Sequence, residues 1–277
     1  MMNLRNQDRE GKLMECNDLL LEKEGHIAIL TLNRPEKLNA LSMEMREFLP
    51  QALQEVQEDD DLRVLIITGA GRGFCSGADV SVQAARADGQ HVVNSRKDIL
   101  EIVGDFVLAF EKINKPVIAA INGVVAGVGL TLTLLCDIRM ASSEARFSAI
   151  WVKRGLIPDG GATFLLPMVV GLDRAFKLTF TGDIIDAQEA ERLNLVTSIV
   201  PANELMNRAK ELAEQIAGMP PVTIEMAKTL MWDEIRSKVR QYLIYESYGQ
   251  NICRSTHDQK EAVKAFMEKR TPQFKGL

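Results

Sequence analysis

Residues 116–136 read PVIAAINGVVAGVGLTLTLLC and contain no charged side chain. A run of this length is long enough to cross a lipid bilayer as a helix. Asn122-Gly123 and the glycines at positions 127 and 129 divide it into a short β-like part and a later helical part. We therefore predict a buried strand, a glycine-rich turn and a buried helix here, and no membrane span.

Strand and helix patterns alternate on both sides of this stretch. Apolar, partly β-branched runs predict strands over 27–32, 64–69, 117–121 and 138–141. Helical spacing predicts helices over 42–56 and 98–112, with Ser42 as the cap of the first. Pro50 inside that helix predicts a kink or a break. This alternation is typical of an α/β fold, and the unit recurs roughly every 40–50 residues, which indicates a spiral stack.

The last third of the chain is predicted to be mostly helical. Helices are expected over 204–217, 221–232, 235–252 and 258–269. Before them, Asp186 is predicted to cap a helix and Glu189 to reach back to it, with Asn194 ending that helix. We divide the chain into a tail (1–18), a core with the ligand site (19–200) and a helical C-terminal region (201–277).

The composition is that of a folded protein without general affinity for polyanions. With 33 basic and 38 acidic residues the formal net charge is −5, which argues against a nucleic-acid binder and against a protein held on an anionic membrane. The N-terminal residues lack the apolar core of a secretory signal. The cysteines, at 16, 75, 136 and 253, form no CxxC pair, which predicts no metal site and indicates a reducing, cytoplasmic compartment.

Two familiar kinds of site do not fit the sequence. Residues 73–77 look like a nucleophile elbow, but Phe74 stands where the motif requires glycine. Phe74 also interrupts a dinucleotide-binding pattern that starts at Gly69, and no Gly-Lys-Ser or Gly-Lys-Thr follows. The three histidines lie far apart and belong to no catalytic motif. Cys75 is expected to be a small buried residue and not a nucleophile.

Two segments share a design that suits the stabilisation of negative charge. Residues 74–79 and 122–129 each follow a strand, contain small residues and open a helical stretch. Small residues let a ligand approach the backbone, and the first N–H groups of a helix have no partner within it. Two such groups that converge on one point would form an oxyanion hole for a thioester oxygen. The alternative is a pair of tight turns.

Four motifs carry a resemblance to a known family. They are NRPEKLNAL at 33–41, FCSGAD at 74–79, ING with its following glycines from 121, and FMEKRTPQF at 266–274. In this order they resemble the crotonase family of enoyl-CoA hydratases and isomerases, over roughly residues 19–276. The resemblance implies an α/β crotonase fold: a spiral of ββα units, a helical C-terminal region that builds trimers, often paired into hexamers, and an acyl-CoA ligand.

The resemblance also implies the residues of the site. The backbone N–H groups of Ala78 and Val128 would form the oxyanion hole, and Val128 replaces a glycine of the family and crowds the approach. The contacts implied for CoA are Lys37, Leu38, Ala78, Asp79, Val80 and Ser81, with Phe266 and Lys269 of a neighbouring subunit at the nucleotide end. Without the resemblance, the basic side chains among them would be taken as solvated surface. CoA enters as part of the substrate, and no other cofactor is implied.

The reaction depends on the side chain that moves the proton. Hydratases of this family use two glutamates, whose positions correspond to Thr131 and Trp151, and neither of these side chains is a base at neutral pH. Asp159 lies in a Pro-Asp-Gly-Gly run that is similar to one in family isomerases, in which a single acid directly follows the proline. A dry pocket would raise its pKa and make it a competent base. The alternative is that Asp159 caps the following helix, whose dipole would lower its pKa.

We therefore expect an enoyl-CoA isomerase that uses Asp159 as acid and base, on a 3-enoyl-CoA or on a ring-derived acyl-CoA such as an epoxyphenylacetyl-CoA. The alternatives are an enoyl-CoA hydratase of fatty-acid β-oxidation and a catalytically silent acyl-CoA-binding protein. The expected partners are the acyl-CoA and further copies of the chain, as a homotrimer or homohexamer. Residues 80–105 are expected to line part of the acyl pocket, and they leave the length of the acyl group open.

Overall fold

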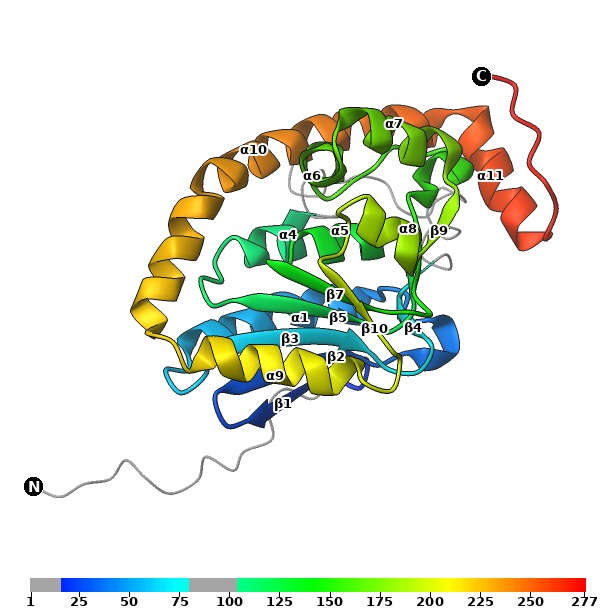
Figure 1. The fold of residues 1–277 in the computed structure, drawn as a ribbon. Coiled ribbons are helices and arrows are strands. Elements are labelled where there is room, and N and C mark those ends of the chain that lie inside the picture. Colours follow the sequence, from blue (N-terminus) through cyan, green and yellow to red (C-terminus); the bar gives the residue numbers. More distant parts are fainter. Residues whose placement is uncertain (1–15, 80–103) are drawn as a thin grey trace, which may run out of the picture.

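Two sheets form the centre of the molecule, and the computed structural model describes residues 16–79 and 104–277 (Figure 1). The six-stranded sheet has the order β1-β2-β3-β5-β7-β10, and the four-stranded sheet has the order β4-β6-β8-β9. The strands are β1 (Leu19–Glu24), β2 (Ile27–Leu32), β3 (Val64–Gly69), β4 (Gly73–Cys75), β5 (Val117–Ile121), β6 (Val124–Ala126), β7 (Ile138–Ser142), β8 (Arg146–Ser148), β9 (Ile184–Asp186) and β10 (Ser198–Val200). All four strands predicted from the sequence are present.

From β3 to β8, successive strands alternate between the two sheets, and this produces the spiral. β3, β5 and β7 lead after short turns into β4, β6 and β8 of the second sheet. Neighbours in the large sheet are parallel except for the hairpin of β1 and β2. The run in β5 is apolar throughout because both faces of this strand are buried. The predicted α/β spiral of ββα units is confirmed.

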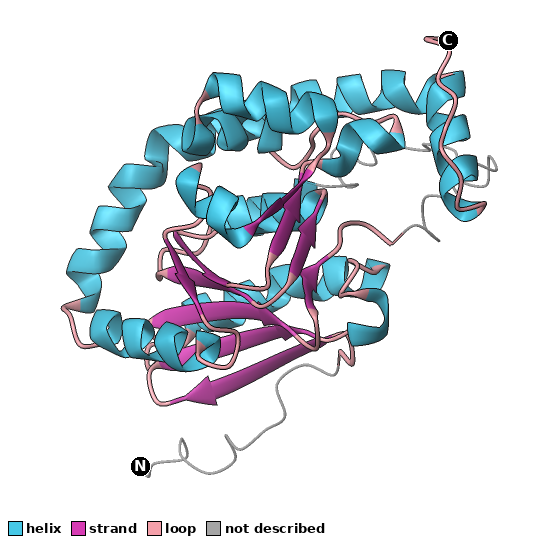
Figure 2. Ribbon diagram, turned by 45° about the vertical axis from the view of Figure 1, so that its right-hand side comes forward, coloured by secondary structure: helices cyan, strands magenta, loops and turns pink. Residues whose placement is uncertain are grey.

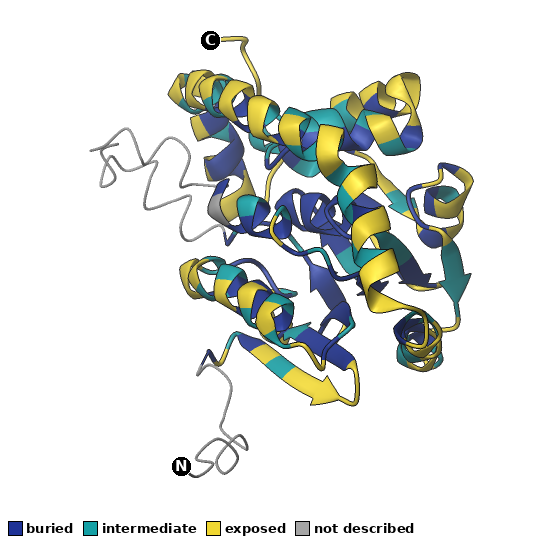
Figure 3. Ribbon diagram, turned by 90° about the vertical axis from the view of Figure 1, so that its left-hand side faces the viewer, coloured by how far each residue is buried: buried dark blue, intermediate teal, exposed yellow. Residues whose placement is uncertain are grey.

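Helices enclose the sheets (Figure 2). They are α1 (Met43–Glu58), α4 (Gly104–Phe110), α5 (Val128–Leu134), α6 (Ala162–Val170), α7 (Leu172–Thr181), α8 (Ala187–Arg192), α9 (Leu205–Ala217), α10 (Pro221–Ser255) and α11 (His257–Met267), with 3-10 turns η1 (Pro35–Lys37) and η2 (Ile150–Arg154). The larger core lies on the side of α1, α5 and α6, and a smaller one lies between the large sheet and α9. Strands β3 and β5 and helix α5 are buried, whereas α10 exposes its outer face (Figure 3).

Helix α1 runs through Pro50 without a break, so the break predicted there was wrong. Proline in a helix interior costs about 3 kcal/mol. The helix buries five apolar side chains, Met45, Leu49, Ala52, Leu53 and Val56, and a large one contributes about 1.5–3 kcal/mol. Burial of this face therefore outweighs the lost hydrogen bond. Ser42 caps the helix as predicted, since its side chain accepts from the N–H of Met45.

Helix α10 is a single helix of 35 residues, whereas the sequence predicted two helices over 221–232 and 235–252. The prediction was wrong because Asp233 and Glu234, which lie between them, do not interrupt a helix as glycine or proline would. Lys228 and Trp232 tie the first half to the large sheet, since each donates to a carboxylate oxygen of Asp137 at 2.7 Å. The second half packs on α6.

Smaller features of the C-terminal half agree with the sequence in part. Asp186 caps α8 and accepts from the N–H of Glu189 at 2.8 Å, but the carboxylate of Glu189 binds Arg192 and does not close the predicted box. Asn194 follows α8 with a left-handed φ of 60°. The helix predicted over 98–112 begins outside the described residues, and its described part is observed as α4. The boundary placed at residue 200 stays a prediction.

Candidate active site

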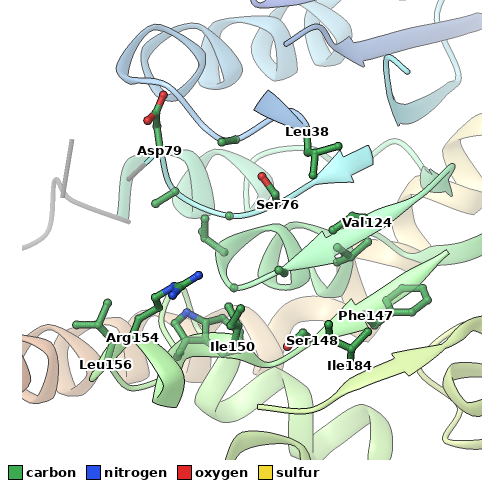
Figure 4. Close-up of a pocket in the computed structure, with 18 of the residues that line it drawn as sticks. Leu38, Ser76, Asp79, Val124, Phe147, Ser148, Ile150, Arg154, Leu156 and Ile184 are labelled. Carbon is green, nitrogen blue, oxygen red and sulfur yellow. The ribbon is translucent and has the colours of Figure 1, made fainter. Parts of the chain in front are cut away.

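A pocket of about 580 Å³ lies between the start of α5, the turn η1 and the segment around η2 (Figure 4). Leu38, Ser76 and Asp79 lie on one wall, and Ile150, Arg154 and Leu156 lie on the opposite wall. The lining consists mostly of apolar and backbone atoms. Its ionisable members are Lys37, Asp79, Arg146, Arg154 and Asp159.

Two glycine turns bring separate loops together at this pocket. Gly77 and Gly127 have φ values of +108° and +53°, a region that side chains with a Cβ rarely occupy. A Cβ built on either glycine would lie 4.0 Å from the Cα of the other. The residue after each glycine, Ala78 in one loop and Val128 in the other, lines the pocket. The two segments singled out in the sequence are therefore neighbours in space.

The backbone hydrogen bonds of the loop direct the N–H of Ala78 away from Leu41. The N–H of Leu41 donates to Gly77 O, and the N–H of Asp79 donates to Leu41 O, so the N–H of Ala78 points to the other side. Val128 is the first residue of α5, and its N–H has no acceptor within the helix. Among the described residues neither N–H makes a backbone hydrogen bond. Unpaired N–H groups on neighbouring loops are what an oxyanion hole requires, and this role of Ala78 and Val128 stays a prediction.

Two asparagine side chains hold the turns that lead into this arrangement, and neither was assigned a separate role from the sequence. Asn39 is fully buried, and its Nδ2 donates to Ala70 O and Gly73 O at 3.0 and 2.7 Å. Asn122 accepts from the N–H of Gly69 at 3.1 Å. Asn39 lies in the motif at 33–41 and Asn122 in the motif that starts at 121. Their place in these motifs is the one feature of the sequence that pointed to them.

The carboxylate of Asp79 is not free, because it is paired with two basic side chains of the loop that contains η1. Its Oδ2 accepts from Arg34 Nη2 at 2.9 Å and from Lys37 Nζ at 3.1 Å. This contact holds the ammonium group of Lys37 at the pocket, where Leu38 and Asp79 also line the wall. The implied contacts Val80 and Ser81 lie outside the described residues. The roles of these residues in CoA binding stay predictions.

Phe266 lines the same pocket, and its contact with the nucleotide end of CoA from a neighbouring subunit stays a prediction. The guanidinium carbon of Arg154 lies 3.8 Å from the centroid of its ring, a cation–π contact. Helix α11 is brought there by a close approach to η2, where a Cβ built on Gly155 would lie 2.7 Å from the Cα of Gln259. Lys269 is exposed and does not belong to the lining.

Asp159 faces the pocket and is held from several sides. Its Oδ1 accepts from Trp151 Nε1 at 2.9 Å and its Oδ2 from Gln250 Nε2 at 3.0 Å, and its main-chain oxygen accepts from Thr131 Oγ1 at 2.8 Å. Burial raises the pKa of Asp159, against the opposing effects of the Trp151 hydrogen bond, of Arg46 and Arg254, and of Gln250. A raised pKa is what a carboxylate needs to act as a base near neutral pH.

Asp159 does not cap helix α6, so the alternative considered from the sequence was wrong. The cap residue is Gly161, without a side-chain bond of its own. Glu246 of α10 takes this role, since its carboxylate accepts from the N–H groups of Gly161 at 2.7 Å and Thr163 at 2.9 Å. The helix end is thus satisfied from a distant part of the chain, which leaves the side chain of Asp159 to the pocket.

Glu246 makes the stability of the fold depend on pH. Burial raises its pKa from 4.5 to about 7, so in this range the folded protein binds more protons at this group than the unfolded chain. The free energy of unfolding therefore falls as the pH rises through this range. We expect the stability difference between the wild type and Glu246→Gln to decrease by on the order of 2–3 kcal/mol from pH 4.5 to 7.5. Urea unfolding at several pH values measures it, and two parallel stability curves would contradict it.

Other chemistries find little support in the described part of the chain. The thiol of Cys75 is buried and its pKa is raised by burial to about 11, so it is not an activated nucleophile. No cluster of His, Cys, Asp and Glu side chains there could hold a metal ion. None of the described helices is long and apolar enough to cross a membrane.

A family model described as Enoyl-CoA hydratase/isomerase matches residues 22–277. The chain therefore belongs to the enoyl-CoA hydratase/isomerase family and has the crotonase fold. A solved structure of an enoyl-CoA hydratase/isomerase from Pseudoalteromonas atlantica is similar to it, with a TM-score of 0.83 and 32 % identity over 93 % of this chain and 100 % of that chain.

Two curated relatives of similar identity carry different activities in their names. A short-chain-enoyl-CoA hydratase of Clostridium acetobutylicum is 39 % identical over 93 % of this chain and 97 % of its own length. A 1,2-epoxyphenylacetyl-CoA isomerase of Escherichia coli is 36 % identical over 93 % of this chain and 98 % of its own length. The protein is thus an acyl-CoA enzyme of this family, and overall identity does not separate hydratase from isomerase.

Proposed function

We propose that this protein is an enoyl-CoA isomerase that uses one acid, Asp159, for both proton transfers. The observation that carries the proposal is that one pocket is lined by Asp159 and by Ala78 and Val128, whose N–H groups make no backbone hydrogen bond among the described residues. Of the two carboxylates in the described lining, Asp79 is bound to Arg34 and Lys37. Asp159 therefore remains as the candidate base.

The two positions that correspond to the glutamates of hydratases support the same conclusion. They hold Thr131 and Trp151, and both side chains donate hydrogen bonds to Asp159. Hydration needs groups that activate a water molecule and deliver a proton, and neither side chain can accept a proton at neutral pH. These positions serve here to hold a single acid.

The proposed reaction shifts a double bond by a 1,3-proton transfer. Asp159 removes a proton from C2 of a 3-enoyl-CoA, the C2–H electron pair forms a C1–C2 double bond, and the C1–O π pair moves to the thioester oxygen to give a dienolate. The thioester oxygen takes the negative charge and accepts from the N–H groups of Ala78 and Val128. Asp159 then returns the proton to C4: the C3–C4 π pair forms the new C4–H bond, the C1–C2 pair becomes the C2–C3 double bond, and the oxygen restores the thioester carbonyl. The 2-enoyl-CoA then leaves. No redox step occurs, and we propose no cofactor beyond the CoA of the substrate.

A hydratase remains the second candidate because a hydratase has 39 % identity with the chain. Purified protein should be incubated separately with a 2-enoyl-, a 3-enoyl- and a ring-derived epoxyacyl-CoA, and the products identified by mass and absorbance. Gain of the conjugated thioester absorbance from 3-enoyl-CoA supports the isomerase. Loss of that absorbance from crotonyl-CoA with addition of water supports the hydratase. Thermal stabilisation by CoA thioesters without turnover of any of them would indicate a binding protein.

We also propose that the protein assembles as a homotrimer or homohexamer. Large apolar side chains are exposed on two helices, among them Phe180 of α7 at 69 % and Leu230 of α10 at 72 %. Such side chains on a folded surface are often covered by another subunit. Light scattering at several protein concentrations measures the state, and a monomer throughout would contradict the proposal.

A further inference from the structure

Helix α10 presents a row of polar side chains to the loop that carries Asp159. Glu246, Gln250 and Arg254 are spaced by four residues and so share one face of the helix. Glu246 binds the start of α6, Gln250 binds the loop before it, and the charge of Arg254 acts on Asp159. Helix α10 thus contacts the candidate base, although Gln250 and Asp159 are 91 residues apart in the sequence.

Gln250 contributes a donor whose orientation is fixed. Its side chain is 3 % exposed, and Nε2 donates both to Ile157 O at 2.9 Å and to Asp159 Oδ2 at 3.0 Å. A reversed amide would place Oε1 against these two oxygens, so only one orientation is favourable. Oε1 is buried and has no hydrogen-bond partner among the described residues. The side chain therefore gives up one hydrogen bond to keep its N–H groups on these oxygens.

The second oxygen of the carboxylate has a matching donor. Trp151 Nε1 donates to Oδ1 at 2.9 Å, and an indole N–H is a donor only. Each oxygen of Asp159 thus faces one N–H that cannot accept a proton in return. When Asp159 has taken a proton, neither of these two neighbours can hold it, so it is available to a substrate in the pocket.

We propose that Gln250 is a positioning residue for the isomerisation, one that fixes the carboxylate of Asp159 in the orientation from which it reaches the substrate; this rests on the proposed function. The hydrogen bond from Nε2 also favours the ionised carboxylate, which is the form that removes a proton. The other described charged groups that act on this carboxylate are Arg46 of α1 and Arg254 of α10, and Glu246 of α10 lies near it.

The variant Gln250→Met removes the donor and keeps the length of the side chain. We expect kcat at the pH optimum to fall about tenfold, KM to stay within about twofold, and the acid limb of kcat/KM to move up by about one pH unit, since a hydrogen bond to a charged group stabilises it by an amount of this size. Gln241→Met is the matched control, because Gln241 lies exposed on the same helix and contacts Tyr245. It should leave kcat and the pH profile unchanged.

A spectroscopic titration tests the same contact without turnover. The chain has two tryptophans, so Trp232→Phe leaves Trp151 as the single reporter beside Asp159. We expect its emission to titrate with Asp159, to lose this transition in Asp159→Asn, and to titrate at higher pH when Gln250→Met is added. If Trp232→Phe does not fold, the indole N–H resonances of the protein with both tryptophans give the same midpoint.

The outcomes separate this inference from the proposed function. The inference would be overturned if Gln250→Met and Gln241→Met had the same acid limb of kcat/KM and the same midpoint of the Trp151 emission titration. This holds whatever the activity of the wild type. A loss of stability alone, with an unchanged pH profile, would also overturn it, since it would show a structural role only. Full activity of Asp159→Asn would overturn the proposed function, while the titration still reports whether Gln250 acts on Asp159.

Discussion

The variant Asp159→Asn is expected to lower isomerase turnover by about 10³-fold to 10⁴-fold, which is the size of effect that a positioned acid and base provides. Asparagine has the shape of aspartate but cannot take up the proton from C2. Its Oδ1 can still accept from Trp151 Nε1, which donates to Oδ1 in the wild type. The variant places its Nδ2 against the donor Gln250 Nε2 but also removes a charge whose ionised form is disfavoured by burial. Because the two effects oppose each other, we expect the melting temperature to stay within a few degrees.

Rates of 2-enoyl-CoA formation and affinity for a CoA thioester should be measured on the same preparation of this variant. We expect the affinity to change by less than about threefold, because the N–H groups of Ala78 and Val128 are unaltered. Asp60→Asn, an exposed aspartate in the loop after α1, is the control and should keep the full rate. A variant Asp159→Asn that turns over at the wild-type rate would rule out Asp159 as the base.

The wild-type pH profile follows from the same group. Burial raises the pKa of Asp159 above its ordinary value of 3.8, and only the ionised form can remove a proton. We therefore expect kcat/KM to fall as the pH decreases through this raised pKa, with an acid limb that lies above the range of an exposed aspartate. An acid limb at the pKa of an exposed aspartate would contradict a buried base.

The parts of the fold that the sequence predicted are those in which local pattern and burial agree. The strand over 117–121 is buried on both faces and reads as an unbroken apolar run. Helix α1 was placed by its apolar spacing, but the effect of Pro50 was misjudged, since its cost is local and the compensating burial depends on tertiary packing. The apolar pattern does not reveal the length of α10, because a short polar stretch weakens the pattern without ending the helix.

The sequence indicated which two loops form the candidate oxyanion site, and it did not indicate how they come together. Small residues after two strands indicated free N–H groups, yet the contact between Gly77 and Gly127 depends on pairing across the small sheet, where β4 and β6 lie side by side. Gln250 and Glu246 were not found from the sequence. They act across more than 80 residues, and a glutamine or glutamate on a long helix has no local feature that marks it as part of a site.

The second large effect is expected from Gly129→Ala, which adds one methyl group at the start of α5. A Cβ at this position would lie 2.1 Å from Cys75 O and 2.9 Å from Cys75 Cβ, so β4 and α5 cannot keep their present distance. Because the obstacle is backbone, we expect the free energy of unfolding to fall by about 3 kcal/mol or more. The first turn of α5 must shift, and the N–H of Val128 shifts with it.

Loss of one donor of an oxyanion hole lowers kcat by about 10²-fold to 10³-fold, and we expect Gly129→Ala to show a loss of this size at a temperature where it is still folded. Circular dichroism and turnover of the same sample measure both effects. Gly218→Ala is the matched control, because a Cβ there would lie 3.4 Å from its nearest atom, Glu214 O, and at the end of α9 it touches no part of the pocket. If Gly129→Ala proved as stable and as active as this control, the close contact of β4 and α5 could not be what sets the distance between the two N–H groups.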